Sequence, residues 1–149
     1  MGGLCFAMRE VGIDNAGGYL VQPTSTIFDW VQLPNGQQGF HTRHDWTAGE
    51  VTQCAGTGSA FLIVHRSVFE KIAAEYDRTW YSPVFNKSLN MTISEDLSFC
   101  SRAGALGIPI HVHTGVRTTH LKQVWLDERF YNRLERLGME PTADGTLGT

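Results

Sequence analysis

The clearest pattern of apolar and polar positions lies late in the chain, where a helical period gives way to a strand period. Phe99, Ala103 and Leu106 recur at helical spacing and predict a helix from Ser94 to Leu106 with one buried face. Ser94 suits the N-cap position, because its hydroxyl can accept a hydrogen bond from a free amide of the first turn. Two acidic residues follow it at once, where the helix dipole favours negative charge. The pattern therefore predicts an amphipathic helix with an acidic beginning.

The end of this helix and the strand after it are also predicted. Gly107 can adopt the left-handed conformation that ends a helix, and Pro109 prevents the helix from restarting. Alternation over residues 110–113 predicts a strand, and we expect Arg117 and His120 in a loop beyond it. In α/β folds, strand ends and helix N-termini often meet at one site. We therefore expect the acidic pair and His120 to lie close together.

Apolar runs elsewhere predict shorter elements. We expect strands at residues 2–8, 50–55 and 60–64, a helix over 68–76, and a last helix over 126–137. Ser67 is the predicted N-cap of the helix over 68–76. Residues 9–49 are rich in glycine and polar residues and predict short strands with long loops, whereas residues 77–91 predict a loop. The fold class predicted by these elements is α/β, a mixed sheet with flanking helices.

Composition narrows the class of protein. The 149 residues suffice for one domain with a core, and 42% hydrophobic with 18% charged residues is typical of a soluble globular protein. A net charge of −3 without a basic tract disfavours nucleic-acid binding. No apolar run approaches the roughly 18 residues of a membrane span, and no leader pattern is visible, so we expect a cytoplasmic protein. Cys5, Cys54 and Cys100 are far apart and odd in number, which favours buried thiols in a reducing compartment.

Two motifs together resemble a known family. The run E-D-L-S-F-C-x-R-A-x-x-L-G-x-P-I-x-V-x-T-x-V-R-x-x-H begins at Glu95 and resembles the C-terminal half of GT-A glycosyltransferases. It is most similar to family-two-like members, including those encoded by bacteriophages. The run G-T-G-S-A-F-L-I-V-H-R-S-V-F-E-K-I over residues 56–72 resembles the segment that precedes it in that family. The resemblance covers residues 2–120 and implies transfer of a sugar from a nucleotide-sugar donor, inverting and dependent on Mn²⁺ or Mg²⁺.

The resemblance also implies roles for individual residues. Asp96 occupies the position of the family's catalytic base, and Glu95 is its orienting or structural partner. A carboxylate suits this role, because inverting transfer needs a base to take the proton of the attacking hydroxyl. His120 occupies the position of a metal ligand, and a neutral imidazole suits manganese better than magnesium. Arg117 can offset the charge of the donor diphosphate or form an ordinary salt bridge.

Two further groups are candidates for substrate binding. Trp80 and Tyr81 can form a platform on which the acceptor stacks, or they can pack in the core. Gly56, Thr57 and Gly58 can line the donor sugar or the acceptor, because glycines allow the backbone to approach a ligand closely. A plain tight turn is the alternative for this segment.

The sequence contains no motif of the family's nucleotide-binding half. That half holds the metal with an acidic D-x-D element, but Asp29, Asp45 and Asp77 each lack a second aspartate two positions later. A glycine-rich phosphate loop is also missing. We therefore interpret residues 1–138 as a partial GT-A domain, its acceptor and catalytic-base half, followed by a polar tail at 139–149. Such a chain is expected to need a separate N-terminal half, a nucleotide-sugar donor and a glycan, protein or lipid acceptor.

Two other classes of function stay open. A non-catalytic carbohydrate-binding or assembly module would keep the aromatic loops without the chemistry. A metal-dependent hydrolase could combine Asp96 with His111, His113 and His120, since H-x-H followed by a later histidine is a conceivable ligand set.

Overall fold

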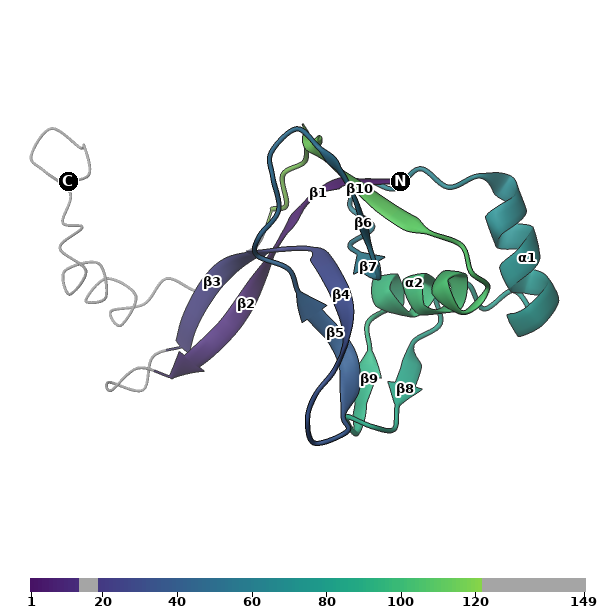
Figure 1. Ribbon diagram of the computed structural model, residues 1–149, viewed down its shortest axis with the longest axis horizontal. Helices are drawn as coiled ribbons and strands as arrows, with labels where there is room; N and C mark the ends of the chain where they lie inside the picture. The colour runs from purple at the N-terminus through teal and green to yellow at the C-terminus, as the bar shows by residue number, and fades with distance from the viewer. Residues whose placement is uncertain (14–18, 122–149) are drawn as a thin grey trace, which may run out of the picture. The chain divides into compact units, whose positions relative to one another are not determined.

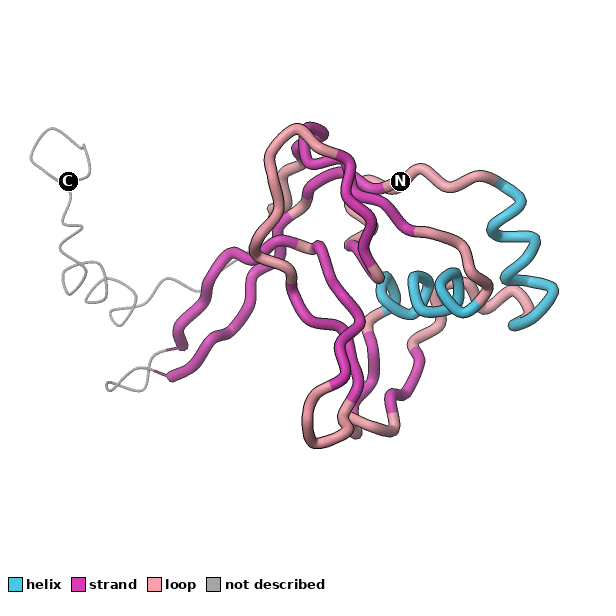
Figure 2. The backbone as a smooth tube through the Cα atoms, viewed as in Figure 1, coloured by secondary structure: helices cyan, strands magenta, loops and turns pink. Residues whose placement is uncertain are grey.

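The computed structural model describes residues 1–13 and 19–121 (Figure 1). The described chain is mixed α/β, mostly strands, with two helices and a mixed sheet (Figure 2). It forms two compact units, of which the first comprises Met1–Ala7 and Pro23–His120. The helix predicted over 126–137 and the tail at 139–149 lie outside the described residues. Neither of the two described helices is long and apolar enough to cross a membrane.

The first unit is built on a mixed sheet with β10 at its centre. Its strands are β1 (Gly2–Leu4), β10 (Ile110–Arg117) and β6 (Val51–Cys54), in that order. β1 runs parallel to β10, whereas β6 runs antiparallel to it. Val112 and Thr114 of β10 are fully buried, as the strand alternation predicts. Arg117 is the last residue of β10 and so belongs to the strand, not to the expected loop after it.

The second sheet and a hairpin complete the strands of this unit. The sheet consists of β5 (Gln38–Thr42), β4 (Ile27–Gln32) and β7 (Gly56–Thr57), and the hairpin of β8 (Val84–Asn86) and β9 (Met91–Ile93). All pairings in both are antiparallel. In addition, β2 (Phe6–Ile13) pairs with β3 (Tyr19–Ser25), and most of these two strands belongs to the second unit.

Two helices pack together over a second core. They are α1 (Arg66–Tyr76) and α2 (Glu95–Ala105). Ile72 of α1 and Phe99 and Ala103 of α2 are buried in one cluster, which confirms the predicted buried face of α2. Leu4, Ile27, Cys54 and Val112 form the other core cluster, beside the β10 sheet. Ile110 packs against both clusters, so the two cores are continuous through the first residue of β10.

Several predicted boundaries were wrong. Residues 60–64 are not a strand: within them only Leu62 forms an isolated bridge, with Gly2. Leu62 and Val64 are apolar because they pack against the helical core. The predicted loop over 77–91 contains β8, and the turn to β9 is closed by the Asn86 side chain, whose Oδ1 accepts from the amide of Ser88 at 2.9 Å.

The caps also differ from those predicted. His65, not Ser67, caps α1: its Nδ1 accepts from the amide of Ser67 at 3.3 Å. The Ser94 side chain makes no capping hydrogen bond. Ser98 fixes the start of α2 instead, since its hydroxyl donates to the Ile93 carbonyl at 3.2 Å and accepts from the Val84 amide at 2.9 Å. The first turn of α2 is therefore tied to the β8–β9 hairpin.

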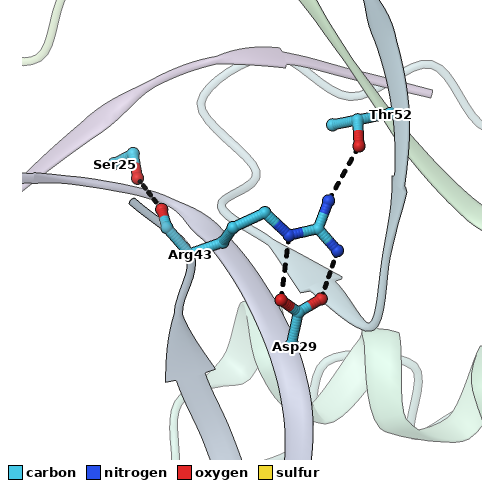
Figure 3. A network of polar contacts seen from close by, with 4 residues as sticks. All are labelled: Ser25, Asp29, Arg43 and Thr52. Carbon is cyan, nitrogen blue, oxygen red and sulfur yellow. Dashed lines mark hydrogen bonds and ion pairs between the residues drawn. The ribbon is translucent and has the colours of Figure 1, made fainter. Parts of the chain in front are cut away.

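An ion pair joins the two sheets (Figure 3). The Arg43 guanidinium binds Asp29 of β4 with two hydrogen bonds, Nε to Oδ2 at 2.8 Å and Nη2 to Oδ1. Its Nη1 donates to the Thr52 hydroxyl of β6 at 2.7 Å. The hydrogen bonds to Asp29 raise the pKa of Arg43. Because Arg43 follows β5, this one side chain connects three strands and also occupies the carboxylate of Asp29.

We expect Arg43→Lys to lower the free energy of unfolding by roughly 0.5–1 kcal/mol, because lysine cannot form the forked contact and both partners are partly exposed. Urea unfolding measures the change. Arg66→Lys is the matched control, since its pair with Glu70 lies on the surface of α1, with 87% and 59% of the side chains exposed. Equal effects of the two substitutions would contradict the special role of Arg43.

Two glycines near the end of α2 should respond to alanine with opposite signs. A Cβ at Gly104 or at Gly107 would meet no atom within 4 Å, so space does not distinguish them. Gly107 has a φ of +69°, whereas Gly104 is helical. Gly104→Ala should stabilise the protein by about 0.5–1 kcal/mol and Gly107→Ala should destabilise it by about 1 kcal/mol. Thermal unfolding of both variants tests this, and shifts of the same sign would contradict it.

Candidate site at the start of α2

The two acidic residues at the start of α2 have different surroundings. Asp96 is half-buried in the first turn, whereas Glu95 is exposed. Asp96 lies close enough to Tyr81 to influence its ionisation: burial raises the pKa of the Tyr81 hydroxyl, and the charge of Asp96 raises it further. A hydrogen bond with the Ser59 hydroxyl lowers the pKa of Tyr81. Asp96, Tyr81 and Ser59 therefore share one neighbourhood.

Only one of the two candidate platform residues faces this neighbourhood. The Tyr81 ring stacks on the buried Phe99 ring, with centroids 4.9 Å apart and planes 10° from parallel, and 36% of Tyr81 stays exposed. Trp80 packs against Phe69 instead, edge to face at 5.7 Å, and its Nε1 donates to the Phe69 carbonyl at 2.9 Å. Trp80 thus contributes to the helical core.

The glycine segment lies tightly against α2 and β4. A Cβ at Gly56 would come within 2.7 Å of the Leu97 side chain, and one at Gly58 within 3.2 Å of the Thr26 hydroxyl. Only glycine allows this approach without displacement of the neighbours. The Thr57 hydroxyl is buried and has no hydrogen-bond partner among the described residues. Buried hydroxyls are usually satisfied, so this segment carries unused hydrogen-bonding capacity.

Ser59 was missed by the sequence analysis. Its position was the one available signal, because Ser59 directly follows the three candidate residues Gly56, Thr57 and Gly58. A serine at that position carries no marker of its own, and only the path of the chain brings it to Tyr81 and Asp96.

Arg117 and His120 lie at the C-terminal end of β10. Both are exposed. The chain between them stays attached to β1, because the amide and hydroxyl of Thr118 donate to the Leu4 carbonyl at 2.9 and 3.0 Å. His120 Nδ1 lies 3.2 Å from the Phe6 carbonyl. Among the described residues, His120 forms no ion pair with an acidic side chain, so its convergence with Asp96 stays a prediction.

The remaining histidines show no common site. His111 and His113 lie on the face of β10 opposite the buried Val112, and His113 Nδ1 accepts from the Gly115 amide at 3.1 Å. Within residues 1–13 and 19–121, no three histidine, cysteine or acidic side chains are grouped as metal ligands.

A separate cavity lies along the C-terminal half of α2. Its volume is about 450 Å³. It is lined by Trp30, Phe40, Gln53, Cys54 and Ala55, and by Cys100, Ser101, Gly104, Ala105 and residues 107–110. Asp96, Tyr81 and Ser59 are not part of its wall. Cys100 of the wall follows Asp96 by one turn of α2, and the charge of Asp96 contributes to the raised pKa of its thiol. The acidic N-terminal neighbourhood and the cavity therefore adjoin along α2.

Compared with family models, with curated proteins and with solved structures, the chain matches none.

The thiol of Cys54 offers a test of the cavity wall. Burial raises its pKa to about 11. At pH 8 about one thiol in a thousand is then ionised, compared with about a quarter in an unfolded chain. We expect iodoacetamide to modify Cys54 more than a hundredfold more slowly in the folded protein than in urea, as measured by peptide mass spectrometry.

The raised pKa of Cys54 also makes the stability of the folded protein depend on pH. The folded state holds this proton more tightly, so the contribution of Cys54 is complete below a pH of about 8.5 and is lost as pH rises toward about 11. Cys54→Ala should remove that part of the pH dependence. Native modification at pH 8 within tenfold of the unfolded rate would contradict the buried thiol.

Proposed function

We propose that this chain is the acceptor-side part of a GT-A-like glycosyltransferase, with Asp96 as its catalytic base. The observation that carries the proposal is the half-buried Asp96 in the first turn of α2, beside Tyr81 and the glycine segment. Partial burial suits a general base, which must reach the substrate without full hydration. The exposed Glu95 lacks this surrounding and serves as a structural neighbour.

The proposed step is a single displacement. The Asp96 carboxylate takes the proton of the acceptor hydroxyl. At the same time the oxygen of that hydroxyl forms a bond to the anomeric carbon of the donor. The bond from that carbon to the diphosphate oxygen breaks, and the nucleoside diphosphate leaves with the electron pair. Attack from the face opposite the leaving group inverts the anomeric centre. The partly exposed Tyr81 ring is suited to position the acceptor by stacking.

His120 is proposed as one ligand of Mn²⁺ or Mg²⁺. When its Nδ1 donates to the Phe6 carbonyl, the lone pair of Nε2 is left to bind a metal, an arrangement common among metal-binding histidines. Such a metal would neutralise charge on the leaving diphosphate. Exposed Arg117 at the end of the same strand could contribute there.

The donor nucleotide is proposed to bind mainly to a separate N-terminal half. Asp29 stands in the sequence without a D-x-D partner, and its carboxylate is already occupied by Arg43. Because Arg43 occupies the Asp29 carboxylate, we propose that the other half supplies the metal ligands of a D-x-D element. The acceptor, whether glycan, protein or lipid, would meet the donor at Asp96.

Asp96→Asn should lower the rate of transfer by about 10²–10⁴, because it removes the basic lone pair while it keeps the size of the side chain. The rate is measured as release of nucleoside diphosphate from a panel of UDP- and GDP-sugars with Mn²⁺. The assay uses the full chain alone if it shows transfer, and otherwise the full chain together with the separate N-terminal half. Glu95→Gln is the matched control, one residue away and exposed, and should leave the rate within a few-fold.

His120→Ala should act differently, by raising the Mn²⁺ concentration needed for half of the maximal rate. If Asp96→Asn keeps most of the activity while Glu95→Gln loses it, Glu95 is the base and the assignment fails. If no sugar nucleotide is consumed but glycans bind, the non-catalytic carbohydrate-binding module becomes the better account. No observation on the described residues specifically favours the metal-dependent hydrolase.

A further inference from the structure

The cavity along α2 has the size and construction of a small-molecule site. At about 450 Å³ it falls within the range of ligand pockets. Its lining residues come from elements far apart in sequence, namely β4, β5, β6, α2, the turn after α2 and the start of β10. Asp96 and Tyr81 are not in its wall, so the proposed transfer chemistry leaves it unexplained.

Two aromatic rings form one wall. Trp30 and Phe40 are paired across β4 and β5, and their rings meet edge to face at 5.1 Å and 85°. Phe40 thereby holds the Trp30 ring in place, while 46% of Trp30 remains exposed. Small residues of α2, among them Ser101, Gly104 and Ala105, also line the cavity. The wall therefore combines a fixed indole with small side chains, which leave room for a flat ring.

The wall carries no formal charge. None of its residues is acidic, basic or histidine, and both cysteines are neutral because burial raises the pKa of each thiol. An anionic ligand such as a nucleotide would find no counter-charge in it. Hydrogen-bonding groups are present, however, in the Gln53 amide, the Ser101 hydroxyl and the peptide groups at the end of α2. The matching ligand is uncharged, with one apolar face and several hydroxyls.

We propose that this cavity binds a neutral pyranose ring, stacked on Trp30, at a site separate from the proposed catalytic one. The C–H face of a pyranose would cover the indole, and its hydroxyls would meet Gln53, Ser101 and the peptide groups. The half-exposed indole leaves the rest of a glycan free to extend into solvent. The proposal goes beyond glycosyl transfer and does not depend on it.

The chain offers a variant that closes the cavity without a packing conflict. A Cβ at Gly104 would meet no atom within 4 Å, and Gly104 lies in α2. We therefore expect Gly104→Leu to fold and to narrow the cavity, because Gly104 is part of its wall. Gly104→Ala is its matched control, because it shares the gain in helix propensity but fills little volume. Trp30→Ala removes the stacking surface, and Phe85→Ala removes an aromatic ring that is 54% exposed and outside the cavity.

The test is a titration of the ¹⁵N-labelled full chain with methyl glycosides of glucose, galactose, mannose and N-acetylglucosamine, followed by NMR. We expect at least one glycoside to shift the Trp30 indole and Gln53 amide signals. Gly104→Leu and Trp30→Ala should each weaken this binding at least tenfold, whereas Gly104→Ala and Phe85→Ala should change it less than twofold. Asp96→Asn should leave it unchanged, so this proposal and the catalytic one can fail separately.

Three outcomes would overturn the proposal. The first is that no glycoside shifts these signals at 50 mM. The second is binding that survives Gly104→Leu, which would place the sugar elsewhere. The third is that indole, as an apolar probe, binds in the cavity while every glycoside fails to displace it, which would make the site one for apolar compounds.

Discussion

The arrangement of the first unit depends on the burial of β10. This strand pairs with β1 on one side and β6 on the other, so Val112 and His113 at its middle are paired on both sides. Ile110, its first residue, packs against both core clusters, and Thr114 fixes the turn before β6 by bonds to Thr47 and Glu50. A polar side chain at 0% exposure is tolerated there because its hydroxyl is fully used.

The position of β10 also helps to hold α2 in place. The turn with Gly107 leads from α2 directly into β10, and Ala103 and Phe99 bury the inner face of the helix. Ser98 fixes the other end against the β8–β9 hairpin. α2 is thus held at both ends, which gives Asp96 a rigid support. Rigid support matters for a base, because small displacements of a catalytic group are costly in rate.

The parts of the fold that could be predicted are those in which one local signal and the tertiary packing agree. The spacing of Phe99, Ala103 and Gly107 specified α2 and its end almost to the residue. Residues 60–64 misled because an apolar run does not reveal whether its side chains face a sheet or, as with Leu62 and Val64, a helical core. The His65 cap could not be foreseen, since histidine is not a preferred N-cap residue.

The candidate site was predictable in its acidic component and less so in its partners. The motif singled out Asp96, and the aromatic pair before it suggested Tyr81; the charge of Asp96 raises the pKa of the Tyr81 hydroxyl. The motif could not indicate that Ser59 joins them or that Trp80 turns into the core, because both depend on how residues 56–59 pass α2. The cavity was invisible in the sequence for the same reason: Trp30, Gln53 and Gly104 are far apart in the chain and carry no common motif.

The separation of the two features along α2 limits how they could work together. Asp96 lies four to eight residues before the cavity wall at Cys100, Ser101 and Gly104, which corresponds to about 6–12 Å along a helix axis. A longer glycan could be held by an inner ring at Trp30 while its end reaches Asp96, and the cavity would then select for the length of the acceptor. Selection for length would arise from binding at a distance from the reaction, which is how remote contacts contribute to specificity in enzymes.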